Sequence, residues 1–236
     1  MPIVSARALA ALPAAVIGLV VLIVLAIVVH PLVGLLAGLA VTALVLWLVL
    51  SRATASALAA IGASPLDEGV EPRLESLVES VCASHGIAEP TVHLVESAAV
   101  DAAVAGRSDD THLVVTRGLL DQLDRLEMEA VIARELSMFG SGIQAATVLA
   151  AIASWIGPLA EPLRDRLLDD RRLVRADFDA VAVTRYPPAL AAAFEKAASA
   201  PRIAHVARAD HLWMVGSGAT SVQPDVTERV DALREL

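Results

Sequence analysis

Several residue types on which common protein functions depend are scarce in this chain of 236 residues. It has a single cysteine, Cys82, so it cannot form an internal disulfide bond, and nothing indicates an oxidising compartment. Lys196 is the only lysine, and the formal net charge is −9. Because no basic cluster offsets this negative charge, the composition argues against nucleic-acid binding.

Charge is also missing from two long stretches near the N-terminus, Ala8 to Val29 and Pro31 to Leu50. Each stretch reaches the roughly 20 residues that cross a hydrocarbon core about 30 Å thick. His30 and Pro31 leave room only for a tight turn, so residues 1–52 are predicted to form a transmembrane hairpin. A cleaved signal peptide is the alternative, but its apolar core would be shorter and no second span would follow at once.

Flanking arginines predict the orientation of this hairpin. Arg7 precedes the first span and Arg52 follows the second, whereas the turn carries only a histidine. The excess of positive charge on cytoplasmic segments therefore predicts that both ends face the cytoplasm. We expect two spans in a bacterial inner (plasma) membrane, with residues 53–236 forming one cytoplasmic domain.

The pattern of that domain predicts an α+β fold that is mostly α, with a small sheet. Strands are predicted at 91–95 and 112–116, because both segments are short and rich in β-branched residues. Asp124 followed three residues later by Glu127 is a capping box, which predicts the start of a helix. Further helices are predicted over 73–84, 176–183, 189–198 and 224–236.

The segment from Glu127 to Phe139, EMEAVIARELSMF, looks like a zinc-protease helix whose metal ligands are missing. In such a helix, two histidines four residues apart bind zinc, and a glutamate beside the first acts as general base. The two ligand positions are Arg134 and Met138 here, while the glutamate is kept as Glu135. A guanidinium has no lone pair to donate to Zn²⁺, and a thioether is a poor zinc ligand.

The order of motifs resembles the HtpX-type membrane zinc metallopeptidases of peptidase family forty-eight. A hairpin precedes the domain, and the family's NAFA-T-G segment is matched by Asp101 to Gly106. Its E-x-x-A-D signature is matched by Leu173 to Asp177, and its terminal ER pattern is found in VQPDVTERVDAL. The resemblance implies a zincin-like metallopeptidase domain and a zinc cofactor.

The sequence departs from the family pattern at the positions that would bind zinc. The resemblance implies that the position of Leu173 supplies the third zinc ligand, and an alkyl side chain cannot coordinate a metal. With Arg134, Met138 and Leu173 at the three ligand positions, we predict that no metal is bound and that Glu135 is a vestige without catalytic activity. No replacement site is indicated, because His85, His93, His112, His205 and His211 lack the spacing of metal ligands.

Asp177 matches the family's aspartate that supports a ligand histidine, and that histidine position is Arg134. We therefore predict an Arg134–Asp177 ion pair, extended to Glu135 and Arg175, that ties two helices together where zinc would stand. The alternative is that Arg134 and Arg175 are solvated surface charges.

A third apolar run, Ile143 to Leu159, is too short to supply the second hairpin found in many HtpX-like proteins. A single span would separate the two signature helices, so this run is expected not to cross the membrane. It is predicted to be a helix that is either buried in the domain or lies on the membrane surface. Trp155 and Trp213 are expected to be packing or membrane-interface residues.

These observations predict a membrane-anchored inactive metallopeptidase homologue, or pseudopeptidase, that acts as scaffold, regulator or subunit of a membrane protein complex. Its expected partners are the lipid bilayer and a membrane protein or peptide segment. Edge addition of a peptide needs backbone hydrogen bonds rather than zinc. The predicted peptide-binding strand comprises His112, Leu113, Val114, Val115 and Thr116. The alternatives are an active zinc-dependent endopeptidase with unusual ligands and a purely structural membrane subunit.

Overall fold

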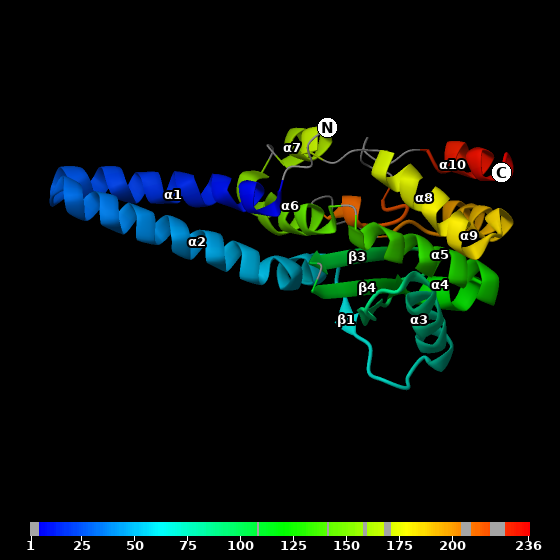
Figure 1. Cartoon of the computed structure of the whole chain (residues 1–236). Coiled ribbons are helices and arrows are strands. Elements are labelled where there is room, and N and C mark those ends of the chain that lie inside the picture. Colours follow the sequence, from blue (N-terminus) through cyan, green and yellow to red (C-terminus); the bar gives the residue numbers. More distant parts are fainter. Residues whose placement is uncertain are drawn as a thin grey trace.

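The computed structural model describes residues 5–107, 109–140, 142–157, 160–167, 171–203, 209–217 and 225–236. The described part is mostly helical, with one small mixed sheet, as the sequence predicts (Figure 1). The hairpin consists of two long helices, α1 (Ala6–Val28) and α2 (Pro31–Ala60).

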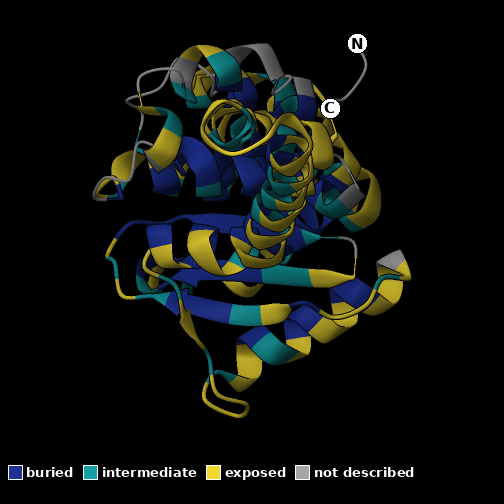
Figure 2. Cartoon of the chain, turned by 90° about the vertical axis from the view of Figure 1, so that its left-hand side faces the viewer, coloured by how far each residue is buried: buried dark blue, intermediate teal, exposed yellow. Residues whose placement is uncertain are grey.

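Both helices of the hairpin are long and apolar enough to cross a membrane. Only 11% of the most apolar window of α1 and 17% of that of α2 are buried, which distinguishes them from the core helices of a soluble protein. Figure 2 shows exposed residues along both helices. The two helices pack closely at Gly18 and Gly38, where a Cβ atom added to Gly38 would lie 2.9 Å from the Gly18 carbonyl oxygen. The predicted transmembrane hairpin therefore has the expected helices, with their apolar side chains directed outward.

The sheet has four strands in the order β1-β2-β4-β3. The strands are β1 (Ser64–Pro65), β2 (Thr91–Val95), β3 (Ala102–Arg107) and β4 (Asp110–Thr116). β2 and β4 are parallel, with Thr91 opposite His112, whereas β3 and β4 are antiparallel, with Ala102 opposite Val115. Strand β3 was not predicted, because its alanines and glycine carry none of the β-branched signal of a strand.

The remaining helices surround this sheet. They are α3 (Pro72–His85), α4 (Arg117–Gln122), α5 (Arg125–Ser137), α6 (Ile143–Ile156), α7 (Ala160–Leu167), α8 (Arg171–Thr184), α9 (Pro187–Ser199) and α10 (Val226–Arg234). Two short 3-10 helices, η1 (Met138–Gly140) and η3 (Asp210–Leu212), follow α5 and precede α10. The predicted helices are confirmed, with their ends displaced by a few residues.

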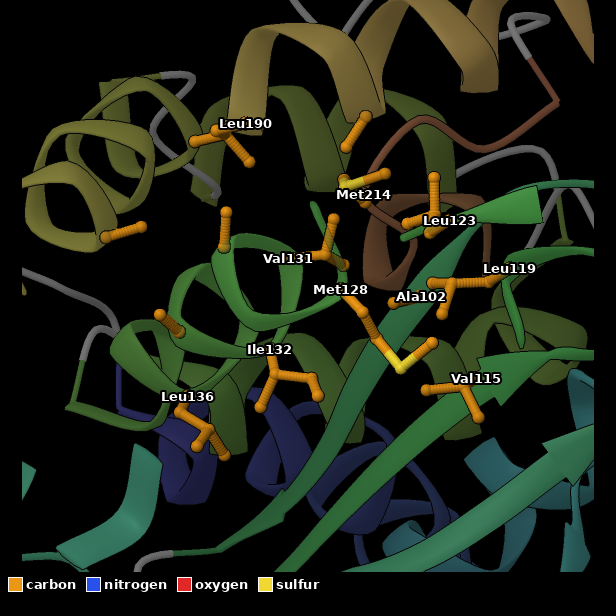
Figure 3. Close-up of a cluster of buried hydrophobic side chains, with 14 of the residues drawn as sticks. Ala102, Val115, Leu119, Leu123, Met128, Val131, Ile132, Leu136, Leu190 and Met214 are labelled. Carbon is orange, nitrogen blue, oxygen red and sulfur yellow. The ribbon is translucent and has the colours of Figure 1, made fainter. Parts of the chain in front are cut away.

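The two faces of the sheet bury different helices, because side chains alternate along a strand. Ala102 and Val104 of β3 face a cluster that includes α5, α3 and α9, whereas Ala103 and Ala105 face a cluster that includes the end of α2 and α6. Figure 3 shows Met128 of α5 beside Val115 of the sheet in the first cluster. The sheet is therefore a middle layer between α5 and the base of the hairpin.

The third apolar run forms helix α6, which the sequence predicts to be either buried in the domain or on the membrane surface. Ala145, Val148 and Ile152 pack against the ends of α1 and α2 that lie nearest the domain, and Ala146 and Leu149 pack on the sheet side. Its long apolar surface is buried between the hairpin and the sheet, which agrees with the predicted helix buried in the domain.

Candidate functional site

Helix α5 carries two of the predicted site residues through the middle of the domain. The Asp124 carboxylate accepts hydrogen bonds from the N–H groups of Leu126 and Glu127, at 2.9 Å and 3.0 Å, and the Glu127 carboxylate accepts one from Asp124 N–H at 2.8 Å. This reciprocal cap confirms the predicted helix start. The helix is buried along most of its length, so Arg134 and Glu135 lie in the protein interior, with 1% and 0% exposure.

Arg134 forms the predicted ion pair with Asp177 of α8. Its Nε donates to Asp177 Oδ1 at 3.1 Å, and its Nη1 donates to Glu135 Oε1. Asp177 is 3% exposed, so the pair is screened very little by solvent. The alternative, a solvated Arg134, is contradicted by this burial.

A second arginine, Arg229 of α10, contacts the same carboxylate. Its Nε donates to Asp177 Oδ2 at 2.8 Å and its Nη2 donates to Asp177 Oδ1 at 2.7 Å, which is the bidentate geometry that favours guanidinium–carboxylate pairs. Its Nη1 donates to the Met214 carbonyl oxygen at 2.9 Å, and its Cζ lies 4.0 Å from the centre of the Phe194 ring. Asp177 therefore joins α5, α8 and α10 through two cations.

Arg175, which was predicted to join this cluster, lies on the exposed side of α8. Residues two positions apart point in different directions from a helix, so Arg175 cannot share the direction of Asp177. Arg229 takes the role instead. Its signal in the sequence was the terminal ER pattern, which the family resemblance had already singled out without assigning a contact.

The four charged groups of Arg134, Glu135, Asp177 and Arg229, here called the charge cluster, balance to zero when all are ionised. Burial acts to lower the pKa of Arg134, but the charges of Glu135 and Asp177 outweigh this effect and raise it above its ordinary value. Arg134 is therefore permanently cationic. Its Nη2 and the Oε2 of Glu135 are buried without a hydrogen-bond partner among the described residues.

The other two predicted ligand positions belong to the hydrophobic core. Met138 is 4% exposed and Leu173 is 3% exposed, and both lie in the cluster formed between α5, α8 and the sheet. Met138 follows α5 directly, and Leu173 lies one turn before Asp177 on α8. The structure therefore places both residues at the same helix junction as the charge cluster, with side chains that pack rather than coordinate.

The predicted peptide-binding strand is in the wrong place for strand addition. His112 to Thr116 form most of β4, which is hydrogen-bonded to β2 on one side and to β3 on the other. Neither backbone edge of β4 is free, so the prediction that these residues accept a peptide strand is wrong. The error arose because β3 was not recognised as a strand.

The edge strand beside α5 is β3, and the chain itself covers part of its edge. Met214 N–H donates to the Ala102 carbonyl oxygen at 2.7 Å, and Trp213 bridges Ala103. Further along, Gly106 N–H donates to the Thr147 hydroxyl of α6 at 2.9 Å. The edge of β3 is therefore capped at both ends by the fold.

Asp101, just before β3, binds residues 213–216, the segment that covers one end of the edge of β3. Its carboxylate accepts hydrogen bonds from the N–H groups of Val215 and Gly216, at 3.1 Å and 2.8 Å. Asp101 is 2% exposed, and burial raises its pKa to about 7 despite these hydrogen bonds. This carboxyl group therefore changes charge near neutral pH.

The histidines do not gather into a metal site among the described residues. His211 is buried and its Nε2 donates to the Ala146 carbonyl oxygen at 2.9 Å, and burial lowers its pKa to about 3. His93 Nε2 lies 3.0 Å from His112 Nδ1, as a hydrogen-bonded pair on β2 and β4. His205 falls outside the described residues.

Comparisons with known proteins support the family resemblance. The profile described as "Peptidase family M48" matches residues 68–142, which include α5 and the whole sheet except β1. The chain resembles the HtpX-type peptidases. A protein named "Protease HtpX homolog" from Bacteroides fragilis is 26% identical over 194 residues, which cover 64% of this chain and 60% of that protein.

Two further HtpX homologues show the range of this similarity. The one from Dictyoglomus thermophilum is 28% identical over 212 residues, covering 70% of this chain and 69% of the homologue. The one from Halobacterium salinarum is 33% identical over 110 residues, covering 42% of this chain and 37% of the homologue. The chain spans 60% of the length of the Bacteroides fragilis HtpX homologue.

The side chains of this HtpX-like domain do not fit the zinc ion that the resemblance implies. Arg134 is cationic and its guanidinium is directed into the charge cluster, and Leu173 has no donor atom. Met138 offers only a thioether within an apolar cluster. Three neutral or anionic donors are the minimum for a catalytic zinc site, and this donor set supplies none that zinc prefers.

Proposed function

We propose that the chain is a membrane-anchored pseudopeptidase that serves as scaffold, regulator or subunit of a membrane protein complex. The charge cluster carries this proposal. Two arginines and two carboxylates hold α5, α8 and α10 together at the positions where the HtpX family is expected to bind zinc. This arrangement supports a domain whose helices are joined by ion pairs rather than by a metal.

The placement of Glu135 supports the same proposal. A general base must accept a proton from a water that a metal or another group has activated. Glu135 instead has one carboxylate oxygen against the guanidinium of Arg134 and is fully buried. Its contacts are those of a structural ion pair.

The partner of this pseudopeptidase is proposed to be a membrane protein or a membrane-adjacent peptide segment. The resemblance to HtpX homologues and the two apolar helices support a function at a membrane, which we propose to be a bacterial inner membrane. Exposed Arg7 and Arg52 flank the hairpin and support a domain that faces the cytoplasm. The partner does not bind by addition of a strand to β4, because both backbone edges of β4 are hydrogen-bonded within the sheet.

The proposal is tested with the full chain and its Glu135→Gln variant. Glutamine keeps an oxygen that accepts from Arg134, but it cannot act as a general base. Because the substitution leaves the charge cluster with a net positive charge, we expect the variant to be less stable than the wild type, and both proteins are compared at a temperature at which both are folded. We expect both to contain no stoichiometric zinc by elemental analysis, and to recover the same membrane proteins after cross-linking in the native membrane.

Two results would contradict the proposal. One is a stoichiometric divalent metal in the purified chain, together with chelator-sensitive cleavage of a membrane substrate that Glu135→Gln abolishes. This result would establish an active peptidase with unusual ligands. The other is loss of function in the cell by Glu135→Gln while folding and partner recovery are unchanged.

A further inference from the structure

Helix α6 contacts the hairpin near the ends of α1 and α2 that lie closest to the domain. α6 packs against Leu9 of α1 and against Val49 and Ala53 of α2. At 1.5 Å per residue, Val49 and Ala53 lie about 27 Å and 33 Å along α2 from its start at Pro31. Since the hydrocarbon core is about 30 Å thick, α6 contacts the hairpin at the boundary between acyl chains and headgroups.

Helix α6 contacts the hairpin along most of its length. Ile143, at its start, belongs to the core cluster around α5, whereas Ala145, Val148 and Ile152 pack with the hairpin. Ile156, at its end, packs against both the hairpin and the sheet-side cluster. In Figure 1 the helix lies alongside the ends of α1 and α2 that are nearest the domain. The last turn of α6, which carries Trp155, therefore lies beside the base of the hairpin.

Trp155 is an exposed aromatic residue in the last turn of this helix. Its exposed fraction is 66%, although the fourteen residues of α6 include no charged residue and most are buried. On the hairpin, Trp47 is 63% exposed, about 24 Å along α2 from Pro31. Exposed Arg52 follows at the end of the span.

Tryptophan and arginine at this depth are typical of a membrane–water interface. The indole ring combines a large apolar surface with one N–H donor, which suits the region between acyl chains and headgroups. A cationic arginine beside it suits phospholipid phosphates. If Trp155 were exposed to water instead, its apolar ring would lack these favourable contacts with lipid.

We propose that the last turn of α6 inserts Trp155 into the headgroup–acyl boundary of the bilayer, so that the domain itself contacts phospholipid. This interaction goes beyond the proposed scaffold function and does not depend on it. The hairpin and Trp155 together form three points of membrane contact, and three points fix the tilt of the domain relative to the membrane. The partner is the lipid of the leaflet nearest the domain.

The test uses the tryptophan emission of the full chain reconstituted into vesicles of phosphatidylcholine and phosphatidylglycerol. The variant Trp47→Phe retains Trp155 and Trp213, and the double variant W47F/W155F retains Trp213 alone. Both substitutions replace exposed side chains, so they preserve the packing of the domain. The difference between the two emission spectra isolates Trp155.

We expect brominated lipids to quench this difference emission. Bromine near the headgroup end of the acyl chain should act more strongly than bromine near its terminus, because an interfacial side chain lies only about 5 to 10 Å into the headgroup–acyl boundary. Trp213, which is 3% exposed, is the internal control and should respond neither to brominated lipid nor to aqueous iodide.

Two outcomes would overturn the proposal. If iodide quenches the Trp155 emission and brominated lipid does not, the residue faces water. If neither reagent quenches it, protein covers the residue instead of lipid.

Discussion

Asp177→Ala is the substitution that tests the charge cluster most directly. It removes the carboxylate that accepts from Arg134 Nε at 3.1 Å, Arg229 Nε at 2.8 Å and Arg229 Nη2 at 2.7 Å. Arg134 keeps its contact with Glu135, and Arg229 keeps the Met214 carbonyl oxygen. Glu135 would then be the one carboxylate left beside two buried guanidinium groups, and the cluster would carry a net positive charge.

The expected cost follows from the burial of this pair. Breaking a buried ion pair by removing one partner costs about 3 to 5 kcal/mol, because the remaining charge is left uncompensated. For a chain of this size, this loss corresponds to a decrease of about 6 to 20 °C in the unfolding midpoint. Since a folded domain is stable by only about 5 to 15 kcal/mol, the variant should be strongly destabilised.

The assay is thermal unfolding of the purified full chain in detergent, followed by circular dichroism. Asp179→Ala is the matched control, because Asp179 lies on the same helix and is exposed. We expect this control to change the free energy of unfolding by no more than about 0.5 kcal/mol. Equal midpoints for the two variants would refute the reasoning, as would a comparable decrease when a chelator is added to the wild-type chain.

Two further predictions concern the same domain. Burial raises the pKa of Asp101 to about 7 from its ordinary value of 3.8. Between these two pH values the folded state holds a proton that the unfolded state releases. The protonated carboxyl group therefore contributes its full stabilisation below pH 3.8, and this contribution is lost as the pH rises to 7. In Asp101→Asn the midpoint should therefore decrease less between pH 5 and pH 8 than in the wild type, and parallel profiles would contradict the assigned shift. The triple variant R134H/M138H/L173E should bind zinc, and its unfolding midpoint should rise on zinc addition while that of the wild type does not; elemental analysis and unfolding curves measure both.

Local signals predicted much of this structure. The capping box at Asp124 placed the start of α5, and the uncharged stretches placed both hairpin helices, because each pattern depends only on neighbouring residues. The Arg134–Asp177 pair was also predictable, since the resemblance places both residues at one site and arginine next to aspartate has an evident physical role.

Non-local pairing explains what the sequence did not reveal. The order of strands in a sheet depends on contacts between distant segments. β3 consists mainly of alanine and glycine, with Val104 as its one β-branched residue, so it gives little strand signal of its own. Without β3, strand β4 looked like an edge. Arg229 lies 52 residues after Asp177, so its contact could not be read from helical spacing, whereas the exclusion of Arg175 could have been.

Helix α2 continues without a break from the hairpin turn to the sheet layer. Its residues Ala57, Leu58 and Ala60 are packed beneath β3 and β4, while its first twenty residues belong to the apolar hairpin. A rod of thirty residues is about 45 Å long and has no joint at the membrane surface. A thinner or thicker bilayer changes the inclination of such a hairpin. Because α2 is continuous, a change in that inclination would turn the attached sheet together with the hairpin.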